Sequence, residues 1–350
     1  MRMWWSRKDI PGRLPGWLAK SSMVLLTAIW AFWGAGELYH EGWWGAWYNP
    51  LFYLIPWVIF LSLTLVSLKW PFVGGGLILV FGIWAGFFFD AIPIGLAIVM
   101  IGGMFLLEGL RLKRLPASFP YRGRNWWIWA AVCPPILIFI GFSARMLPIV
   151  LTRQDDGDRS ARVIAGNGLD LLWAPEGPGW NWRQPWGGYP SWDSIALYGA
   201  DPVGMDWKEK PGYGRQDDGT WRHASGGDMA RSNLCFFLSD DGMTLMNEPQ
   251  HFWRMPTVDE LVRSLGRHGE TAGCVWQGEF RRQVSCEIMP DKETPLWAPD
   301  LAPIYYWAAE AYDEQDGFFV SFNGYVNATH KSGGNPRHSY RCVREVDRYP

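Results

Sequence analysis

The sequence predicts a fold in two parts, an α-helical membrane domain with five transmembrane helices followed by an α+β exterior domain. Five apolar stretches fill the first 150 of the 350 residues, and the chain then becomes polar and rich in Gly, Pro and Trp. Hydrocarbon about 30 Å thick requires about 20 apolar residues of helix. We therefore expect membrane spans at about 18–39, 50–68, 70–89, 92–110 and 126–147.

The connections between these stretches alternate in charge. The N-terminal tail, Lys69 and the connection 111–124 carry Lys and Arg, whereas the connections at 37–49 and Asp90 carry none. Positive charge resists translocation, so the Lys- and Arg-bearing segments stay in the cytoplasm. We expect a multi-pass protein of the inner (plasma) membrane, with a cytoplasmic N-terminus and with residues 151–350 in the periplasm or outside the cell.

The two parts also differ in net charge. Residues 1–150 contain 12 Lys and Arg against 5 Asp and Glu, whereas residues 151–350 contain 20 against 29. An acidic exterior domain repels nucleic acid and anionic lipid surfaces. No nucleic-acid partner is expected.

Tryptophan is in excess, with 14 of its 25 residues in the first 150. Its ring is apolar while its N–H needs a polar partner, so Trp favours the headgroup zone of a bilayer. The alternative is packing against neighbouring membrane subunits. The expected membrane-interface anchors are Trp4, Trp5, Trp17, Trp43, Trp44, Trp47, Trp126 and Trp127.

The membrane part has few groups that could carry ions or electrons. Its acids lie near the expected helix ends, and its single histidine, His40, cannot ligate a bis-histidine haem. Proton and ion paths use ionisable groups at mid-depth. We expect an anchor and packing surface without a cofactor, in which Gly82 and Gly86 let helices approach closely.

The polar run 151–162 reads as a linker, and 163–350 is long enough for one domain with its own core. Helices are expected at 228–238 and at 257–265, where Thr257 and Glu260 form a capping box. Phe318, Val320 and Phe322 alternate as in a half-buried strand. Asn323-Gly324 then predicts a hairpin turn, because both residues tolerate positive φ, and a last strand is expected at 340–346.

Four of the five cysteines fall in the exterior part, and Cys133 falls inside the fifth span. An even number in an oxidising compartment implies two disulfides. The spacing allows three pairings and does not choose among them.

Several motifs, in order, resemble those of the Lcl-type C-terminal domain family, named for a collagen-like bacterial adhesin. The most specific is FWRMPTVDEL, which is similar to the family's WRLPT-x-x-EL signature. The others are GNGLDLLWAPEG (166–177), ARSNLCFFL (230–238), IYYWAAEAY (304–312), FFVSFNGYVN (318–327) and SYRCVREV (339–346).

The resemblance implies a C-type-lectin-like fold, which is also similar to formylglycine-generating enzymes. In the family, the helix cysteine can pair with the cysteine of the closing strand, which implies Cys235–Cys342 and leaves Cys274–Cys286. The family also implies binding of extracellular ligands, sugars included. The chain departs from the family in its acidic exterior domain, since sulfated sugars require basic surfaces, and in having five spans but no collagen-like repeat.

Aromatic residues crowd the start of the exterior domain. On a lectin-like scaffold they would stack on sugar rings or anchor a protein partner, whereas the favoured interpretation is that they fill the core. The candidate binding aromatics are Trp173, Trp180, Trp182, Trp186 and Trp192.

The sequence contains few signals of a catalytic site or a metal site. A formylglycine-type oxidase would use Cys274 and Cys286 as a copper-binding pair, but no histidine or cationic cluster beside them points to a lowered thiol pKa. The histidines lack zinc-type spacing. Calcium needs six to eight converging oxygens, and the acids at 313–316 and 240–241 read better as solvated loops. No metal is expected.

These observations favour a non-enzymatic membrane subunit whose exterior lectin-like domain docks to or braces a larger membrane complex. A photosynthetic or respiratory assembly is the suggested host, so the expected partners are other integral membrane proteins and the lipid bilayer. The alternative is a surface receptor or adhesin that binds glycan. The remote alternative is an oxidase of the formylglycine-generating type.

Overall fold

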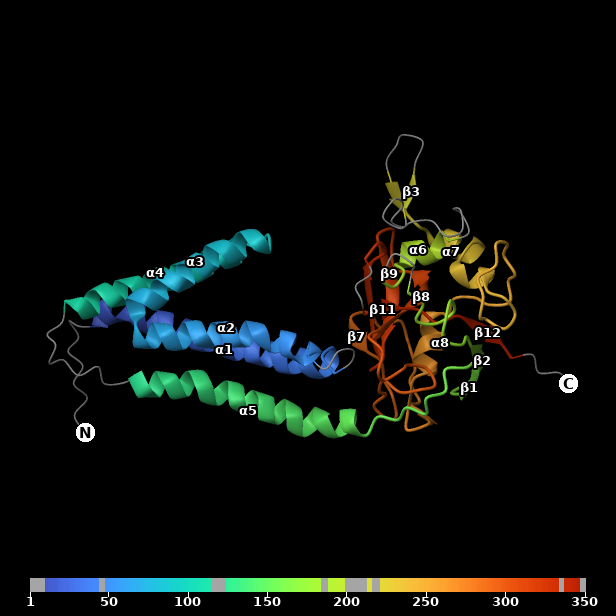
Figure 1. Cartoon of the computed structure of the whole chain (residues 1–350), viewed down its shortest axis with the longest axis horizontal. Coiled ribbons are helices and arrows are strands. Elements are labelled where there is room, and N and C mark those ends of the chain that lie inside the picture. The colour runs from blue at the N-terminus through green and yellow to red at the C-terminus, as the bar shows by residue number, and fades with distance from the viewer. Residues whose placement is uncertain are drawn as a thin grey trace. The chain divides into compact units, whose positions relative to one another are not determined.

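The computed structural model describes residues 10–43, 48–114, 124–183, 188–198, 213–215, 221–333 and 337–346. The chain divides into two compact units, Met1–Leu151 and Thr152–Pro350. Helices make up the first unit, whereas the second combines short helices with several small sheets (Figure 1).

The first unit contains five long helices. They are α1 (Ile10–His40), α2 (Asn49–Lys69), α3 (Pro71–Phe88), α4 (Ile92–Lys113) and α5 (Arg124–Leu151). All five are long and apolar enough to cross a membrane. The five expected stretches are thus confirmed as helices. Three of them extend three or more residues beyond the expected bounds: α1 begins at Ile10, α4 runs to Lys113 and α5 runs to Leu151.

Proline sets the start of three of these helices. Pro50, Pro71 and Pro93 each occupy the first turn of α2, α3 and α4. A proline there loses no hydrogen bond, because the first backbone N–H groups of a helix have no partner within it, and its fixed φ suits the helix. The connections from α2 to α3, at Trp70, and from α3 to α4, at residues 89–91, are correspondingly short.

Glycine lines the contact between α3 and α4. A Cβ added to Gly95 would lie 2.7 Å from the Cα of Gly86, and one added to Gly82 would lie 2.9 Å from the backbone nitrogen of Val99. The expected close approach at Gly82 and Gly86 is therefore confirmed. Without side chains between them the two backbones come into direct contact, which is the kind of packing that holds helices together in a lipid bilayer.

The α3–α4 contact can be tested with two adjacent glycines. A Cβ on Gly102 would lie 2.8 Å from the Gly75 carbonyl oxygen, whereas a Cβ on Gly103 would meet nothing within 4 Å. Overpacking typically costs about 1–3 kcal/mol, so we expect Gly102→Ala to destabilise the helical unit by that amount. Gly103→Ala should leave it unchanged. Thermal unfolding in detergent would measure both, and equal effects would contradict the contact.

Buried polar groups in this unit are bonded to one another. Lys20 Nζ donates to Glu108 Oε1 at 3.1 Å, and both side chains are under 10 % exposed. The second oxygen of Glu108 lies 3.4 Å from Arg111 Nη1. Thr27 and Thr64 share a hydrogen bond of 2.9 Å between α1 and α2. These contacts tie α1 to its neighbours through groups that would be costly to bury alone.

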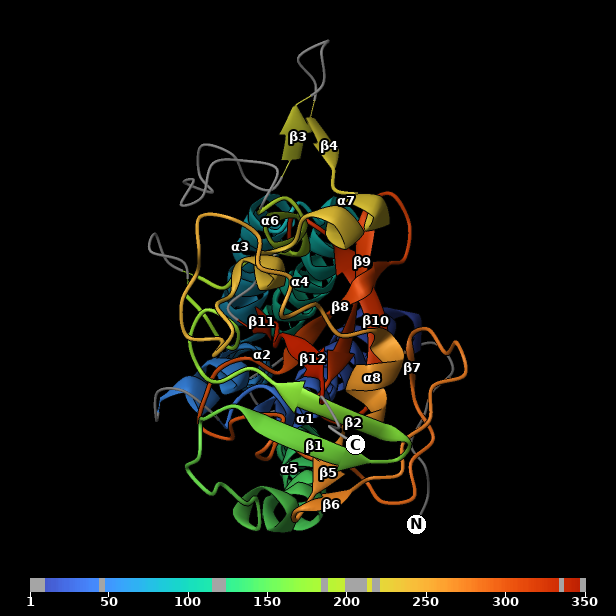
Figure 2. The same ribbon diagram turned by 90° about the vertical axis from the view of Figure 1, so that its right-hand side faces the viewer.

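The second unit is built from several small sheets (Figure 2). Its strands are β1 (Arg162–Gly166), β2 (Leu169–Trp173), β3 (Tyr213–Arg215), β4 (Trp221–His223), β5 (Gly266–Arg267), β6 (Glu270–Thr271), β7 (Arg282–Gln283), β8 (Tyr305–Ala311), β9 (Asp316–Ser321), β10 (Tyr325–His330), β11 (His338–Ser339) and β12 (Val343–Glu345). One sheet has the order β1-β2-β12 and another the order β11-β8-β9-β10-β7. Strands from both ends of the unit therefore lie side by side.

Short helices lie between these strands. They are α6 (Trp192–Ala196), α7 (Gly226–Arg231), the 3-10 helix η1 (Leu234–Phe237) and α8 (Val258–Arg263). The expected capping box of α8 is confirmed, because Thr257 Oγ1 accepts from the Glu260 N–H and Glu260 accepts from the Thr257 N–H. The expected hairpin is confirmed too, with Val326 of β10 opposite Val320 of β9. Only Gly324 of its turn takes a positive φ, at 82°.

The single helix expected at 228–238 is wrong. The segment contains α7, a break at Ser232 and Asn233, and then η1. The Asn233 side chain donates to the Met229 carbonyl at 2.7 Å, so it competes with the helical backbone for an acceptor. The disulfide between Cys235 and Cys342 also fixes η1 from outside the segment.

Tryptophan fills the interior of the second unit. Trp173, Trp180, Trp192, Trp253, Trp297 and Trp307 are all less than 2 % exposed. Short strands and helices present few aliphatic side chains to a common centre, and large rings supply the missing contact area. Arg341 is fully buried with its guanidinium 3.6 Å from the Trp180 ring centre, and burial lowers the pKa of Arg341 to about 9.

Candidate functional site

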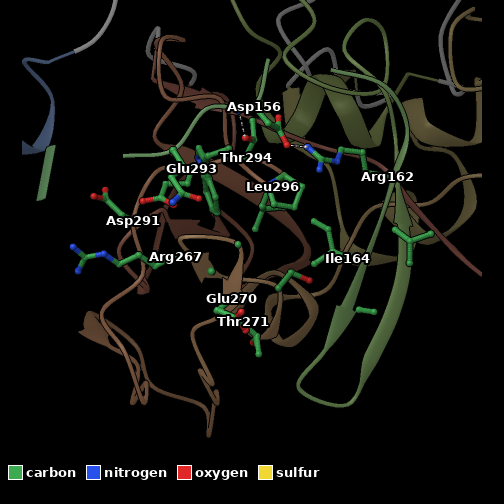
Figure 3. A pocket seen from close by; sticks show the side chains of 18 of the residues that line it. Asp156, Arg162, Ile164, Arg267, Glu270, Thr271, Asp291, Glu293, Thr294 and Leu296 are labelled. Carbon is green, nitrogen blue, oxygen red and sulfur yellow. Dashed lines mark hydrogen bonds and ion pairs between the residues drawn. The ribbon is translucent and has the colours of Figure 1, made fainter. Parts of the chain in front are cut away.

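The described residues surround a cleft of about 310 Å³ in the second unit. One wall is strand β1, and another is the β5–β6 hairpin together with the end of α8. The third is the segment 291–297, which contributes two acids and Trp297 (Figure 3). This volume lies at the lower end of the range for small-ligand sites.

Two tight turns position the walls. Asn167 and Gly168 join β1 to β2 with φ values of 52° and 80°, and His268 and Gly269 join β5 to β6 with 55° and 79°. Two-residue turns with both central φ values positive match the twist of a hairpin. The Asn167 side chain donates to the Cys274 carbonyl at 2.6 Å, which ties the β1–β2 turn to the disulfide-bonded loop.

Neighbouring segments border the cleft at both ends of β1. A Cβ on Gly166 would lie at ordinary contact distance, 3.6 Å, from the Thr271 methyl carbon, so the end of β1 lies beside β6. At the other end, Asp156 donates its N–H to Thr294 Oγ1 at 3.3 Å, and its carboxylate binds Arg162 at 2.6 Å (Figure 3). The expected linker is thus bonded to the domain and forms part of the cleft.

Two buried carboxylates lie in the wall formed by 291–297. Asp291 is 3 % exposed and Glu293 is 5 % exposed. Asp291 Oδ1 accepts from Arg153 Nε at 2.9 Å, and Glu293 Oε2 accepts from the His268 N–H at 2.6 Å. The pKa of Arg153 is lowered mainly by burial, an effect that the negative charge of Asp291 opposes.

One oxygen of each carboxylate is without a hydrogen bond. Asp291 Oδ2 and Glu293 Oε1 meet no hydrogen-bond donor within the described part of the chain, although Glu293 Oε1 lies 3.4 Å from His268 Nδ1. Both oxygens are shielded from water, and most buried polar atoms in proteins are paired. Both residues line the cleft, so their negative charge attracts a cation that enters it.

The positive side chains of the cleft are mostly neutralised. Arg162 binds Asp156, and Arg263 lies 2.8 Å from Asp259. Arg267 has no ion pair among the residues that the structure describes. Glu270, the residue across the β5–β6 hairpin from Arg267, is exposed and forms no ion pair within the described ranges. The cleft therefore offers both signs of charge, with the carboxylates in the majority.

Strand β1 presents a free edge to the cleft. It is the outer strand of its sheet, paired on one side with β2. Gly166 and Leu169 flank a two-residue turn and so form a hydrogen-bonded pair. Hydrogen-bonded and non-hydrogen-bonded pairs alternate along antiparallel strands, so the N–H and C=O groups of Val163 and Ala165 point away from β2. The N–H and C=O groups of these two residues have no backbone partner within the described ranges. Val163 is 51 % exposed.

The structure corrects the candidate binding aromatics. Trp173, Trp180 and Trp192 are fully buried, so they serve the core and cannot contact a ligand. Trp180 and Trp192 donate their indole N–H groups to Tyr306 Oη and to the Ala308 carbonyl. Trp182 is half-buried against the core, and Trp186 lies outside the described residues. Core packing, the favoured interpretation, thus holds for these three residues.

A different aromatic cluster lies at the surface. Trp276 and Phe280, from the loop closed by the Cys274–Cys286 disulfide, pack on Tyr312 and Phe318. The Phe280 and Tyr312 ring centres are 4.2 Å apart, and Tyr312 is 45 % exposed. No local sequence signal predicts this cluster, because its members come from segments that are far apart in the chain.

The expected cysteine pairs are both present as disulfides. Cys235 joins Cys342 across a sequence separation of 107, and Cys274 joins Cys286 across 12. The remaining cysteine, Cys133 of α5, is free. With Cys274 and Cys286 bonded to one another, neither sulfur is a thiol that could ligate copper in this state.

The interface tryptophans that can be placed lie at the surface of the first unit. Trp17, Trp43 and Trp126 are exposed, and Trp127 packs edge-on against Trp17 at 5.3 Å between ring centres. Trp4, Trp5, Trp44 and Trp47 lie outside the described residues.

The remaining candidates for metal-binding or catalytic groups make structural contacts. The described residues contain no group of three His, Cys, Asp or Glu side chains that could hold a metal ion. Asp193 is fully buried and lies 2.7 Å from His223 Nδ1. Burial raises the pKa of Asp193, and the bond to His223 opposes that rise. The nearby Ser332 bonds His330 instead of His223, so these groups do not form a Ser–His–Asp triad.

No family model, curated protein or solved structure matches the chain. The likeness of its motifs to the Lcl-type family remains a resemblance.

Proposed function

We propose that the protein is a membrane-anchored interaction subunit without enzymatic activity. Its five apolar helices hold it in the inner membrane, and its disulfide-bonded second unit lies outside the cytosol and docks to a larger membrane complex. The alternation of Lys and Arg between the helices supports this orientation. Two disulfides within the second unit support it independently, because such bonds persist in oxidising compartments.

The observation that carries the docking role is the cleft beside the free edge of β1. Protein surfaces generally cover or charge an exposed strand edge, because its unpaired backbone groups are a template for another chain. Here the edge faces a bounded cleft with carboxylates in its wall. The helical unit supports an anchoring role, because Lys20, Glu108 and the Thr27–Thr64 pair are used in contacts between its own helices.

Glycan binding is the second candidate function, and the surface aromatic cluster around Tyr312 favours it. Half-exposed rings suit stacking on sugars, and the polar side chains of Gln277 and Gln283 lie on the same disulfide-bonded loop. The lectin-like resemblance of the sequence motifs supports the same proposal.

One set of measurements separates the two functions. The full chain, tagged at its C-terminus, would be purified in mild detergent and tested for co-purifying membrane proteins and for binding to a glycan array. We expect stable membrane-protein partners, and we expect a reporter fused after Pro350 to be active only outside the cytosol. Purification as a monomer that binds neutral glycans, with loss of binding in Tyr312→Ala, would instead establish the second function. A cytosolic reporter would refute both.

A further inference from the structure

We propose that the cleft beside β1 binds an extended segment of a partner polypeptide, which adds as a strand to β1 and places a Lys or Arg side chain against the wall of Asp291 and Glu293. The proposal rests on the docking function above and names the chemistry of the partner. Strand addition of this kind obtains affinity from main-chain hydrogen bonds and specificity from side-chain pockets.

The backbone of β1 is suited to this pairing. Val163 and Ala165 each direct one N–H and one C=O away from β2, so the edge offers four groups to an incoming strand. Arg162 and Ile164 direct their side chains toward the segment 291–297, as Figure 3 shows. A strand added to this edge would lie in the plane of the β1–β2 sheet, and its side chains on the face of Arg162 and Ile164 would point toward the segment 291–297.

The charge of the cleft favours a basic residue in that strand. Asp291 and Glu293 each have a buried oxygen that accepts no hydrogen bond from the residues that the structure describes, and Glu270 is exposed on the β5–β6 hairpin. Two of the three lining arginines are already paired with Asp156 and Asp259. The second unit as a whole is acidic, with 20 Lys and Arg against 29 Asp and Glu over residues 151–350. A cationic segment would be steered to it and held there.

The cleft also limits the length of the segment. Strand β1 itself sets this length, since it runs from the neighbourhood of the Asp156–Thr294 bond to Gly166 beside Thr271. At about 3.3 Å per residue, a strand of this span contains about five residues. A short linear motif fits this space, whereas a whole folded domain would contact only its rim.

The test is selection of peptides by the intact protein. A phage-displayed library of randomised heptapeptides would be panned against the full chain in lipid nanodiscs. We expect enriched sequences with one Lys or Arg among β-branched residues. A synthetic consensus peptide should bind at least tenfold more tightly than its Lys→Gln form. No enrichment, or enrichment of acidic sequences, would overturn the proposal.

Variants of the strand edge give the matched control. Ala165→Pro removes an outward N–H while leaving the bonds to β2 intact, and Ala165→Thr adds bulk but keeps the N–H. We expect the consensus peptide to lose at least tenfold in affinity for Ala165→Pro and little for Ala165→Thr. The peptide supplies a second control that needs no change in the protein. N-methylation should abolish binding at alternate residues only, and indifference at every residue would refute strand addition.

The role of the Asp291 and Glu293 carboxylates is tested separately with the double variant Asp291→Asn, Glu293→Gln. This variant should lose the preference for Lys over Gln in the peptide. Because Asp291 also binds Arg153, the exposed Glu270→Gln serves as a second variant that leaves this contact intact, with a smaller loss of the same preference expected. An unchanged preference in both would refute the charge recognition.

Co-purification with Ala165→Pro and with the unaltered chain distinguishes a wrong binding site from a wrong docking function. If membrane proteins co-purify equally well with Ala165→Pro and with the unaltered chain, docking stands and the cleft is not its site. If nothing co-purifies with the unaltered chain, the docking function itself fails.

Discussion

Replacement of Cys235 and Cys342 together by Ala is expected to lower the stability of the second unit by about 4–5 kcal/mol. In the chain-entropy model the effect of a disulfide grows with the loop it closes, and a loop of about 100 residues gives about 4.7 kcal/mol. This disulfide joins residues 107 apart in sequence. It links η1 to the residue just before β12, so it connects the middle of the domain to its closing strand. Both sulfurs lie in the core, and neither cysteine is exposed.

Tryptophan fluorescence of the full chain during denaturant unfolding would measure the change, because six tryptophans lie in the core of this unit. The matched control is Cys274→Ala with Cys286→Ala. That disulfide closes a loop of only 12 residues, for which the same model gives about 3 kcal/mol or less. If removing the Cys274–Cys286 disulfide lowered the stability more than removing Cys235–Cys342, the larger stabilising effect assigned to Cys235–Cys342 would be contradicted.

Local signals in the sequence were sufficient for the helical unit and for individual turns. Apolar length alone locates α1 to α5, because each stretch is long and apolar enough to form a helix that could cross hydrocarbon. The capping box at Thr257 and the hairpin after Ser321 depend on residues within four positions of one another. The Asn167-Gly168 pair carries the same kind of signal, and its turn makes β1 the strand that borders the cleft.

The cleft could not be predicted from the sequence, because its walls come from three distant segments. β1, the β5–β6 hairpin and the segment 291–297 are brought together only by the tertiary fold. Nor does the sequence around Asp291 and Glu293 distinguish these buried acids from exposed ones. The helix expected at 228–238 failed for the same reason, since Asn233 and the distant Cys342 override a local periodicity. Burial of Trp173, Trp180 and Trp192 likewise depends on neighbours far along the chain.

Glu108→Gln is expected to destabilise the helical unit by about 3–5 kcal/mol, the usual effect of breaking a buried ion pair by changing one member. Glu108 is 6 % exposed and receives Lys20 Nζ at 3.1 Å. The neutral amide keeps the shape of the side chain but leaves the charge of Lys20 without its carboxylate in a site of low polarisability. The packing around Glu108 allows little adjustment, because a Cβ on Gly16 would lie 2.4 Å from its carboxyl carbon.

Two further variants distinguish the effect of the Lys20–Glu108 ion pair from the effect of side-chain packing. Arg111→Gln removes the outer, 28 % exposed partner at 3.4 Å and should cost less than about 1 kcal/mol, as exposed pairs generally do. Lys20→Met combined with Glu108→Met removes both buried charges and should recover most of the stability lost in Glu108→Gln, because apolar replacement of a whole buried pair is often neutral. Unfolding of the full chain in detergent mixed with sodium dodecyl sulfate would rank the three. If the double variant were less stable than Glu108→Gln, the two side chains would have to contribute through packing, and the interpretation of Lys20 and Glu108 as one buried pair would fail.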